Sequence, residues 1–204
     1  MPQHLTLNLS LLFVVVALPV VCLAQQAPPP ALAADTRQAD ARVRETWPRV
    51  WAELQWIQQQ GTRYAWTTDM QGPAHAIPGR NLIELNPRFL GRADYPRDRW
   101  LIVVWHEYGH ILFRRSDSGR GGNRGWQDRI ASEHAAFEYS LQRAIDWANT
   151  RDDAGPLREV LKNLRQRSQA AQAEATNDPH TPAIRQLMSE PLWSQAESVA
   201  RATR

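Results

Sequence analysis

The segment from Val103 to Phe113, Val-Val-Trp-His-Glu-Tyr-Gly-His-Ile-Leu-Phe, limits the fold more than any other stretch of the chain. Glu107 is its only charged residue, and such a run predicts a segment buried inside the protein. On a helix, His106 and His110 would lie on one face, one turn apart. Burying a carboxylate and two imidazoles is costly unless they have partners, and a shared metal ion would be such a partner. The segment therefore predicts a buried helix that carries part of a metal site.

Glu107 follows His106 directly, so on a helix it is turned by about 100° from that histidine. Its carboxylate would lie beside a metal held by His106 and His110, where it suits a general base that takes a proton from a metal-bound water. Gly109 costs about 1 kcal/mol relative to alanine inside a helix, which indicates that another segment packs close to it. The alternative is an accidental motif in a helical protein that binds no metal.

A zinc site of this kind needs a third protein ligand. Segment 126–148 has apolar residues at helical spacing: Trp126, Ile130, Phe137, Leu141, Ala144 and Ala148. Glu133 falls within this apolar stripe, where a carboxylate needs a partner. We therefore expect Glu133 to be the third ligand, on a second helix packed against the first. The alternatives are an ion pair between Glu133 and one of the many arginines, or His134 or Glu138 as the ligand.

The four residues His106, Glu107, His110 and Glu133 resemble the site of zincin metallopeptidases of the gluzincin type. In these enzymes H-E-x-x-H on one helix is completed by a Glu on a later helix. The segment Glu133-His134-Ala135-Ala136 is also similar to the E-x-x-A around the ligand in several gluzincin families. The resemblance covers roughly residues 81 to 139 and implies zinc-dependent hydrolysis of peptide bonds. It departs from the pattern at Phe137, where many gluzincins have an Asp that holds a zinc histidine.

The rest of the chain predicts an α+β fold that is mainly helical. A small antiparallel or mixed sheet would precede the metal-binding helix, and the C-terminal part would be helical. Further stretches have helical spacing: 36–60 with a bend at Pro48, 156–175 and 181–200 with a break at Pro191. Two short stretches have strand character: 63–68 and 81–85. The resemblance suggests that strand 81–85 is the sheet edge that binds an extended peptide, and a plain structural edge is the alternative.

Several residues are candidates to complete the site, and the sequence does not choose between them. The group that stabilises the transition state is often a His, Tyr or Arg, and the candidates are Tyr108, His134, Tyr139 and His180. His75 falls in a predicted loop and is expected at the surface. The glycine-rich segment 116–125 joins the two ligand helices, either as a mobile lid or as a plain connection.

The N-terminus predicts export. Residues 11–23 form an apolar run that is shorter than the roughly 18 residues a membrane span needs, so residues 1–24 are interpreted as a signal peptide. A proline-rich linker, 25–35, and a single zincin-like domain, 36–204, would follow. The mature protein would be periplasmic or secreted, without stable membrane insertion. A lipid anchor on Cys22 and an uncleaved anchor are the alternatives.

The charge of the chain excludes one class of partner. Its 24 basic residues are interspersed with 21 acidic ones, for a net charge of +3, and no basic patch for nucleic acid is visible. Cys22 is the only cysteine, so the mature domain would have no disulfide and would depend on packing and on bound zinc. We expect an exported zinc metallopeptidase that acts on peptides or proteins. The alternative is an inactive zinc-binding protein that serves as a binding module.

Overall fold

The computed structural model describes residues 31–92, 95–116, 125–173 and 178–203. These residues form a mainly helical α+β fold, which confirms the predicted class. The helices are α1 (Ala31–Thr46), α2 (Pro48–Gln59), α3 (Arg97–Ser116), α4 (Trp126–Arg151), α5 (Gly155–Ala173), α6 (His180–Met188) and α7 (Pro191–Ala202). The strands are β1 (Arg63–Trp66), β2 (Ala74–Ile77) and β3 (Leu82–Leu85), with short 3₁₀ turns η1 (Pro78–Arg80) and η2 (Pro87–Phe89).

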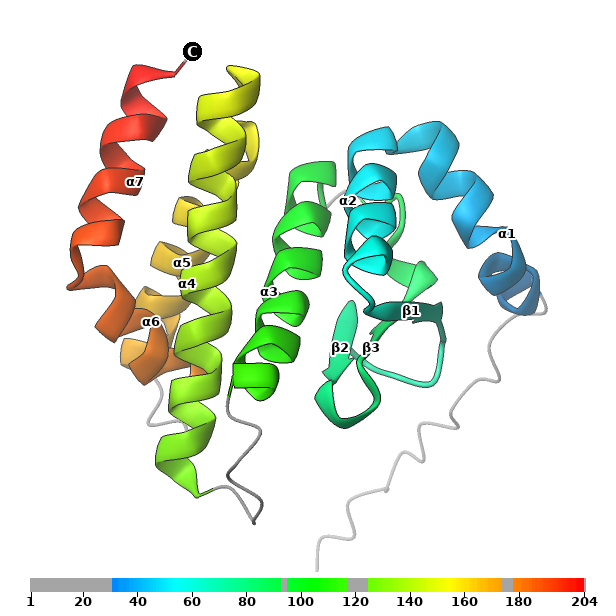
Figure 1. Cartoon of the computed structure of the whole chain (residues 1–204), viewed down its shortest axis with the longest axis horizontal. Helices are drawn as coiled ribbons and strands as arrows, with labels where there is room; N and C mark the ends of the chain where they lie inside the picture. The colour runs from blue at the N-terminus through cyan, green and yellow to red at the C-terminus, as the bar shows by residue number, and fades with distance from the viewer. Residues whose placement is uncertain (1–30, 93–94, 117–124, 174–177, 204) are drawn as a thin grey trace, which may run out of the picture.

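Helix α3 lies in the middle of the molecule. Figure 1 shows α4 to α7 on one side of it and α2 with the small sheet on the other, while α1 lies beyond α2. A helix that packs on both sides must be apolar around most of its circumference. Leu101, Val104, Trp105 and Ile111 are accordingly almost completely buried. The apolar run that opened the sequence analysis is therefore the central element of the core.

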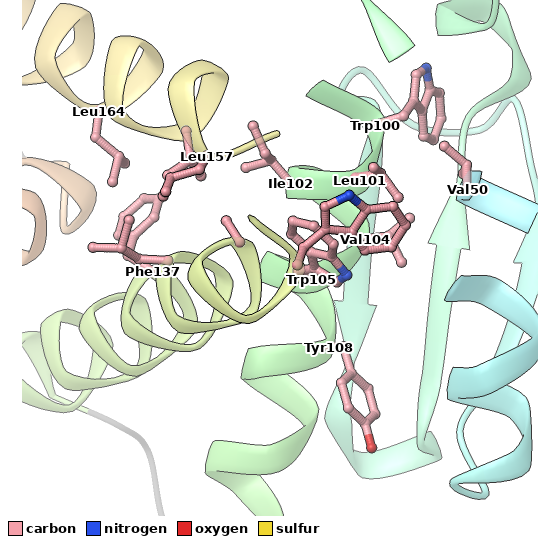
Figure 2. Close-up of a cluster of buried hydrophobic side chains, with 14 of the residues drawn as sticks. Val50, Trp100, Leu101, Ile102, Val104, Trp105, Tyr108, Phe137, Leu157 and Leu164 are labelled. Atoms are coloured by element: carbon pink, nitrogen blue, oxygen red, sulfur yellow. The ribbon is translucent and has the colours of Figure 1, made fainter. Parts of the chain in front are cut away.

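The core continues across α3 from one half of the molecule to the other. Figure 2 shows Val50 and Trp100 on the side of α2, and Phe137 facing Leu157 and Leu164 of α5 on the other side. The helix pair α3 and α4 is especially close at Gly109. A Cβ atom there would lie 2.7 Å from the Cα of Ala136. The close approach predicted from Gly109 is thus confirmed, and it brings the two predicted ligand helices together.

The sheet has the strand order β1-β3-β2, with β1 parallel and β2 antiparallel to β3. The mixed sheet was predicted, but its edge was placed wrongly. Strand 81–85 corresponds to β3, which is paired on both sides and therefore has no open edge for a peptide. The edge strand beside α3 is β2, which the sequence analysis interpreted as a loop, so His75 lies on a strand. Four residues of Ala-His-Ala-Ile are too short to show a clear alternation.

The other predicted helix boundaries either agree with the structure or differ from it at the helix ends. Pro48 separates α1 from α2, and Gly61, with a φ of 80°, follows the end of α2. Helix α1 begins at Ala31, so the last part of the predicted linker 25–35 is helical. The predicted signal peptide, with Cys22, and most of segment 116–125 lie outside the described residues. Within the described residues, no helix has the length and hydropathy needed to cross a membrane.

Candidate metal centre

Three histidine rings converge on one oxygen of Glu133. The Nε2 atoms of His106 and His110, one turn apart on α3, lie 3.3 and 3.6 Å from Glu133 Oε2. The Nε2 atom of His180, at the start of α6, lies 3.2 Å from the same oxygen. The donor atoms of His106, Glu133 and His180 all lie within 4.8 Å of one another. The structure thus brings together the three residues predicted as ligands and adds a histidine that the sequence left among several candidates.

These separations fit a shared ion better than hydrogen bonds. Among the described residues, the only buried side-chain nitrogen and oxygen atoms without a hydrogen-bond partner are Glu133 Oε2 and His106 Nδ1. Zinc binds nitrogen and carboxylate oxygen at about 2.0–2.2 Å in a tetrahedral arrangement, so two of its ligand atoms lie about 3.4 Å apart. The observed N···O separations of 3.2 to 3.6 Å match that edge length. The donor atoms of His106, Glu133 and His180 are close enough together to hold one ion, whereas the predicted ligand His110 is not part of that compact group. An imidazole and carboxylate donor set is typical of zinc.

The electrostatics of the centre keep its donors in the state that a metal requires. Burial raises the pKa of Glu133, but its interactions with His106, and then with His110 and His180, outweigh burial and hold the pKa at about 2. Burial and the neighbouring charge of His106 lower the pKa of His110 to about 4. Near neutral pH, Glu133 is therefore ionised and His110 is neutral. Metal ligands must be deprotonated in just this way.

Two of the histidines are oriented by a partner on Nδ1. The Nδ1 atom of His110 lies 2.9 Å from Ser132 Oγ. His180 Nδ1 is hydrogen bonded to the carboxylate of Asp178, which also accepts the backbone N–H of His180 at 3.2 Å. An Nδ1 partner fixes the ring and leaves Nε2 directed at the centre. These contacts supply orienting groups that the sequence analysis could not identify, since the position one turn after Glu133 is occupied by Phe137.

Phe137 contacts the histidines of the centre through its ring rather than through a hydrogen bond. Its ring centroid lies 4.4 Å from that of His106 and 6.0 Å from that of His180. The side chain is buried. Phe137 therefore holds His106 by packing, where an Asp would hold a histidine by a hydrogen bond. The Nδ1 atom of His106 has no hydrogen-bond partner among the described residues.

Glu107 lies beside the cluster, as its place after His106 predicts. Its Oε2 accepts the backbone N–H of Ala76, on edge strand β2, at 2.7 Å. Burial raises the pKa of Glu107, against lowering effects of His106 and of the Ala76 N–H. A carboxylate with a raised pKa that is fixed through one oxygen has the properties of a general base. The structure thus holds Glu107 beside the cluster, and β2 positions it.

The remaining candidates have other partners. The rings of Tyr108 and Tyr139 pack against each other, and Tyr108 is almost completely buried. His134 Nε2 is 2.8 Å from Glu190, and its Nδ1 is 4.0 Å from Glu138, so neither replaces Glu133 as a ligand. The alternative of an arginine partner for Glu133 also fails, because the ion-pair contacts of Glu133 in the described residues are all to histidines.

His180 is the residue that sequence reasoning could not assign. Its side chain is 32% exposed, against 12% for His106 and 14% for His110, so it lies at the solvent side of the cluster. Ala183, Ile184 and Leu187 bury one face of α6 in the helical half and so hold its first residue over Glu133. The only local signal was Asp178 two residues before His180. That spacing becomes meaningful only when α6 is docked against α4.

Comparisons with protein-family models, with curated proteins and with solved structures found no match for this chain. The interpretation of the centre therefore depends on its own geometry and chemistry.

Proposed function

We propose that the chain is an exported zinc-dependent metallopeptidase whose catalytic base is Glu107. The observation that carries the proposal is the convergence of His106, His110 and Glu133 from two packed helices, with Glu107 beside them and held by β2. The resemblance to gluzincins supports the same assignment of roles. Export is the part of the proposal that rests on residues 1–24 of the sequence alone.

A bound zinc ion would supply a water molecule acidic enough to lose a proton near neutral pH, and it would polarise the scissile carbonyl. Glu107 would take a proton from the attacking water as the water oxygen bonds to the carbonyl carbon. When the C–N bond breaks, the amine nitrogen leaves with the proton that Glu107 carried. The Ala76 N–H holds Oε2 of Glu107 in place during both transfers, and Oε1 has no hydrogen-bond partner among the described residues.

His180 is suited to stabilise the charge that develops on the carbonyl oxygen. It lies on the exposed side of the cluster, where a substrate approaches, and Asp178 orients its ring through Nδ1. Its Nε2 atom is therefore directed at the centre, where an N–H donor would stabilise an oxyanion. Asp178 is then a positioning residue, since it acts through His180.

The second candidate function is a closed zinc-binding centre without hydrolysis. One observation favours it: His180 Nε2 is as close to Glu133 as His106 Nε2 is, so His180 has the position of a fourth ligand. Four protein ligands leave no place for a water molecule and characterise structural zinc sites. Whether His180 binds the metal or the substrate therefore separates the two candidates.

The variant Glu107→Gln tests the peptidase directly. We expect it to keep its zinc and its fold but to lose hydrolysis of a mixed peptide library by roughly 10²- to 10⁴-fold, the usual contribution of a general base. Glu138→Gln is the matched control, because the side chain of Glu138 on α4 is 53% exposed. This variant should cleave peptides like the parent protein. Equal turnover in Glu107→Gln and the parent would contradict the assignment.

His180→Ala separates the two candidate functions. In the peptidase, zinc affinity stays within a few fold of the parent value while turnover falls. In the closed centre, zinc affinity falls by an order of magnitude or more, and neither protein hydrolyses peptides.

A further inference from the structure

Helix α5 carries a half-buried arginine, Arg167, whose guanidinium lies beside the metal centre in contact with one aromatic ring. The Cζ atom of Arg167 lies 5.5 Å from the centroid of Phe137, and the ring of His106 lies 4.4 Å from the same centroid. Arg167 also interacts electrostatically with Glu133 and Asp178, which places its charge beside the centre. The guanidinium is therefore part of the surroundings of the candidate site although it belongs to a different helix.

The charge of Arg167 is not neutralised by an ion pair. Within the described residues, no hydrogen bond or ion pair reaches its guanidinium, and its contact with Phe137 is a cation–π contact. Burial lowers the pKa of Arg167, so holding the charged group there has a cost. The nearby acids are already engaged, Asp178 by His180 and Glu133 by the three histidines.

Two other half-buried arginines are paired with a carboxylate of the chain itself. Arg143, 28% exposed, makes contacts of 3.1 and 3.2 Å with Glu53, and Arg99, 23% exposed, lies 2.8 Å from Glu159. Arg167 has no such carboxylate among the described residues and differs from them in lying beside the metal centre, so its guanidinium is available to a carboxylate from outside the chain.

Tyr95, which precedes α3, interacts electrostatically with both Glu107 and Arg167. The proposed base and the unpaired guanidinium thus share one neighbour. A substrate whose scissile bond lies at Glu107 would therefore bring its adjoining groups within reach of Arg167.

We propose that Arg167 binds a carboxylate of the peptide substrate beside the metal centre, so that the enzyme prefers substrates with an anionic group next to the scissile bond. The planar guanidinium presents paired N–H donors that match the two oxygens of a carboxylate. The carboxylate is either the free C-terminus of a peptide, as in removal of a C-terminal residue or dipeptide, or an acidic side chain. This inference rests on the proposed peptidase function, because it assigns the substrate of that same site.

The test measures peptide binding separately from cleavage. Three matched peptides are used: one with a free C-terminal carboxylate, the same peptide with a C-terminal amide, and the amide with an acidic side chain beside the scissile bond. Their affinities are measured by calorimetry on zinc-loaded Glu107→Gln, with and without the further substitution Arg167→Met. Methionine keeps an aliphatic chain over Phe137 but removes the charge. Lys162→Met, an exposed position on α5, is the control.

We expect Arg167→Met to lower the affinity for a carboxylate-bearing peptide by about 10- to 100-fold, the usual contribution of a hydrogen bond to a charged group. The affinity for the plain amide peptide should not change. Loss for the first peptide alone identifies the C-terminal carboxylate, and loss for the third identifies the acidic side chain. Two results would overturn the inference and leave Arg167 as a packing residue. One is that Glu107→Gln binds all three peptides with equal affinity. The other is that adding Arg167→Met weakens the binding of all three peptides equally. Carboxylate-selective binding in a protein whose parent cleaves none of the peptides would instead overturn the peptidase proposal while the role of Arg167 stands.

Discussion

Two enclosed carboxylates, Glu53 on α2 and Glu133 on α4, lie near the packed helices α3 and α4 and have opposite surroundings. Glu53 is 3% exposed and accepts the indole N–H of Trp105 at 2.9 Å and three contacts from Arg143 at 3.1, 3.2 and 3.4 Å. Glu133 is 14% exposed, its ion-pair contacts within the described residues are with imidazole nitrogens at 3.2 to 3.6 Å, and its Oε2 has no hydrogen bond there. The first carboxylate is fully satisfied by the chain, and the second is not.

The comparison indicates different roles for the two clusters. The Glu53 cluster joins α2 to α3 and α4, and its charge is balanced by Arg143 from the protein itself. The Glu133 cluster joins α3, α4 and α6, and the proposed metal ion would balance its carboxylate. Trp105 of the first cluster adjoins His106 of the second, so the satisfied network fixes the helices on which the unsatisfied one is built. We therefore expect the first cluster to govern stability and the second to govern metal binding.

The largest stability effect should come from Glu53→Ala. The substitution leaves the guanidinium of Arg143 enclosed without its carboxylate and the Trp105 indole N–H without an acceptor. We expect a loss of about 3–5 kcal/mol in the free energy of unfolding, measured by urea denaturation. The folded fraction should still bind zinc. A loss below 1 kcal/mol would show that the network does not hold the helices together.

Acid should weaken the metal-free protein through the second cluster. The pKa of His110 is about 4 in the folded protein and about 6.5 in an unfolded chain, so the unfolded state takes up the proton first. Stability is thus complete above about pH 6.5 and is lost as the pH falls toward 4, by up to about 3 kcal/mol. The depressed pKa of Glu133, about 2, makes its contribution disappear only in stronger acid, below the usual value of 4.5.

Urea denaturation of the chelator-treated protein at a series of pH values measures this dependence. His110→Gln should flatten the curve between pH 6.5 and 4, while Glu138→Gln should not change it. An unchanged curve in His110→Gln would show that other groups cause the acid sensitivity.

A smaller effect is expected where the two helices meet. In Gly109→Ala the new methyl group would lie 2.7 Å from the Ala136 Cα, so α3 and α4 must move apart. We expect a loss of about 1–3 kcal/mol, the usual cost of overpacking, together with weaker zinc binding because the ligands separate. Gly79→Ala, where a Cβ meets nothing within 4 Å, is the control. Unchanged stability and zinc affinity in Gly109→Ala would mean that the helix spacing does not set the geometry of the centre.

The sequence predicted the parts of this molecule that depend on local pattern. The spacing of His106 and His110, the turn between His106 and Glu107, and the place of Glu133 in an apolar stripe all follow from helical periodicity. Gly109 indicated the close helix contact for the same reason. The helical breaks at Pro48 and Pro191 were equally local, because proline lacks the N–H that continues a helix.

The missed features depend on how distant segments dock. Strand β2 is four residues long and exists because it pairs with β3 and holds Glu107, neither of which is encoded in its own pattern. His180 and Arg167 reach the centre only through the packing of α6 and α5 on α4. The predicted peptide-binding edge was wrong because strand order, which puts β3 in the middle, is a tertiary property.

The most direct test of the whole account is the zinc content of purified residues 25–204, compared with the same protein carrying Glu133→Ala. After dialysis against trace zinc, elemental analysis should find about one zinc per chain in the parent protein and almost none in the variant. Glu53→Ala, assayed on its folded fraction, should keep the zinc of the parent. Absence of zinc from the parent protein even after reconstitution, or equal zinc in the parent and Glu133→Ala, would contradict the claim that the histidines around Glu133 form a metal centre.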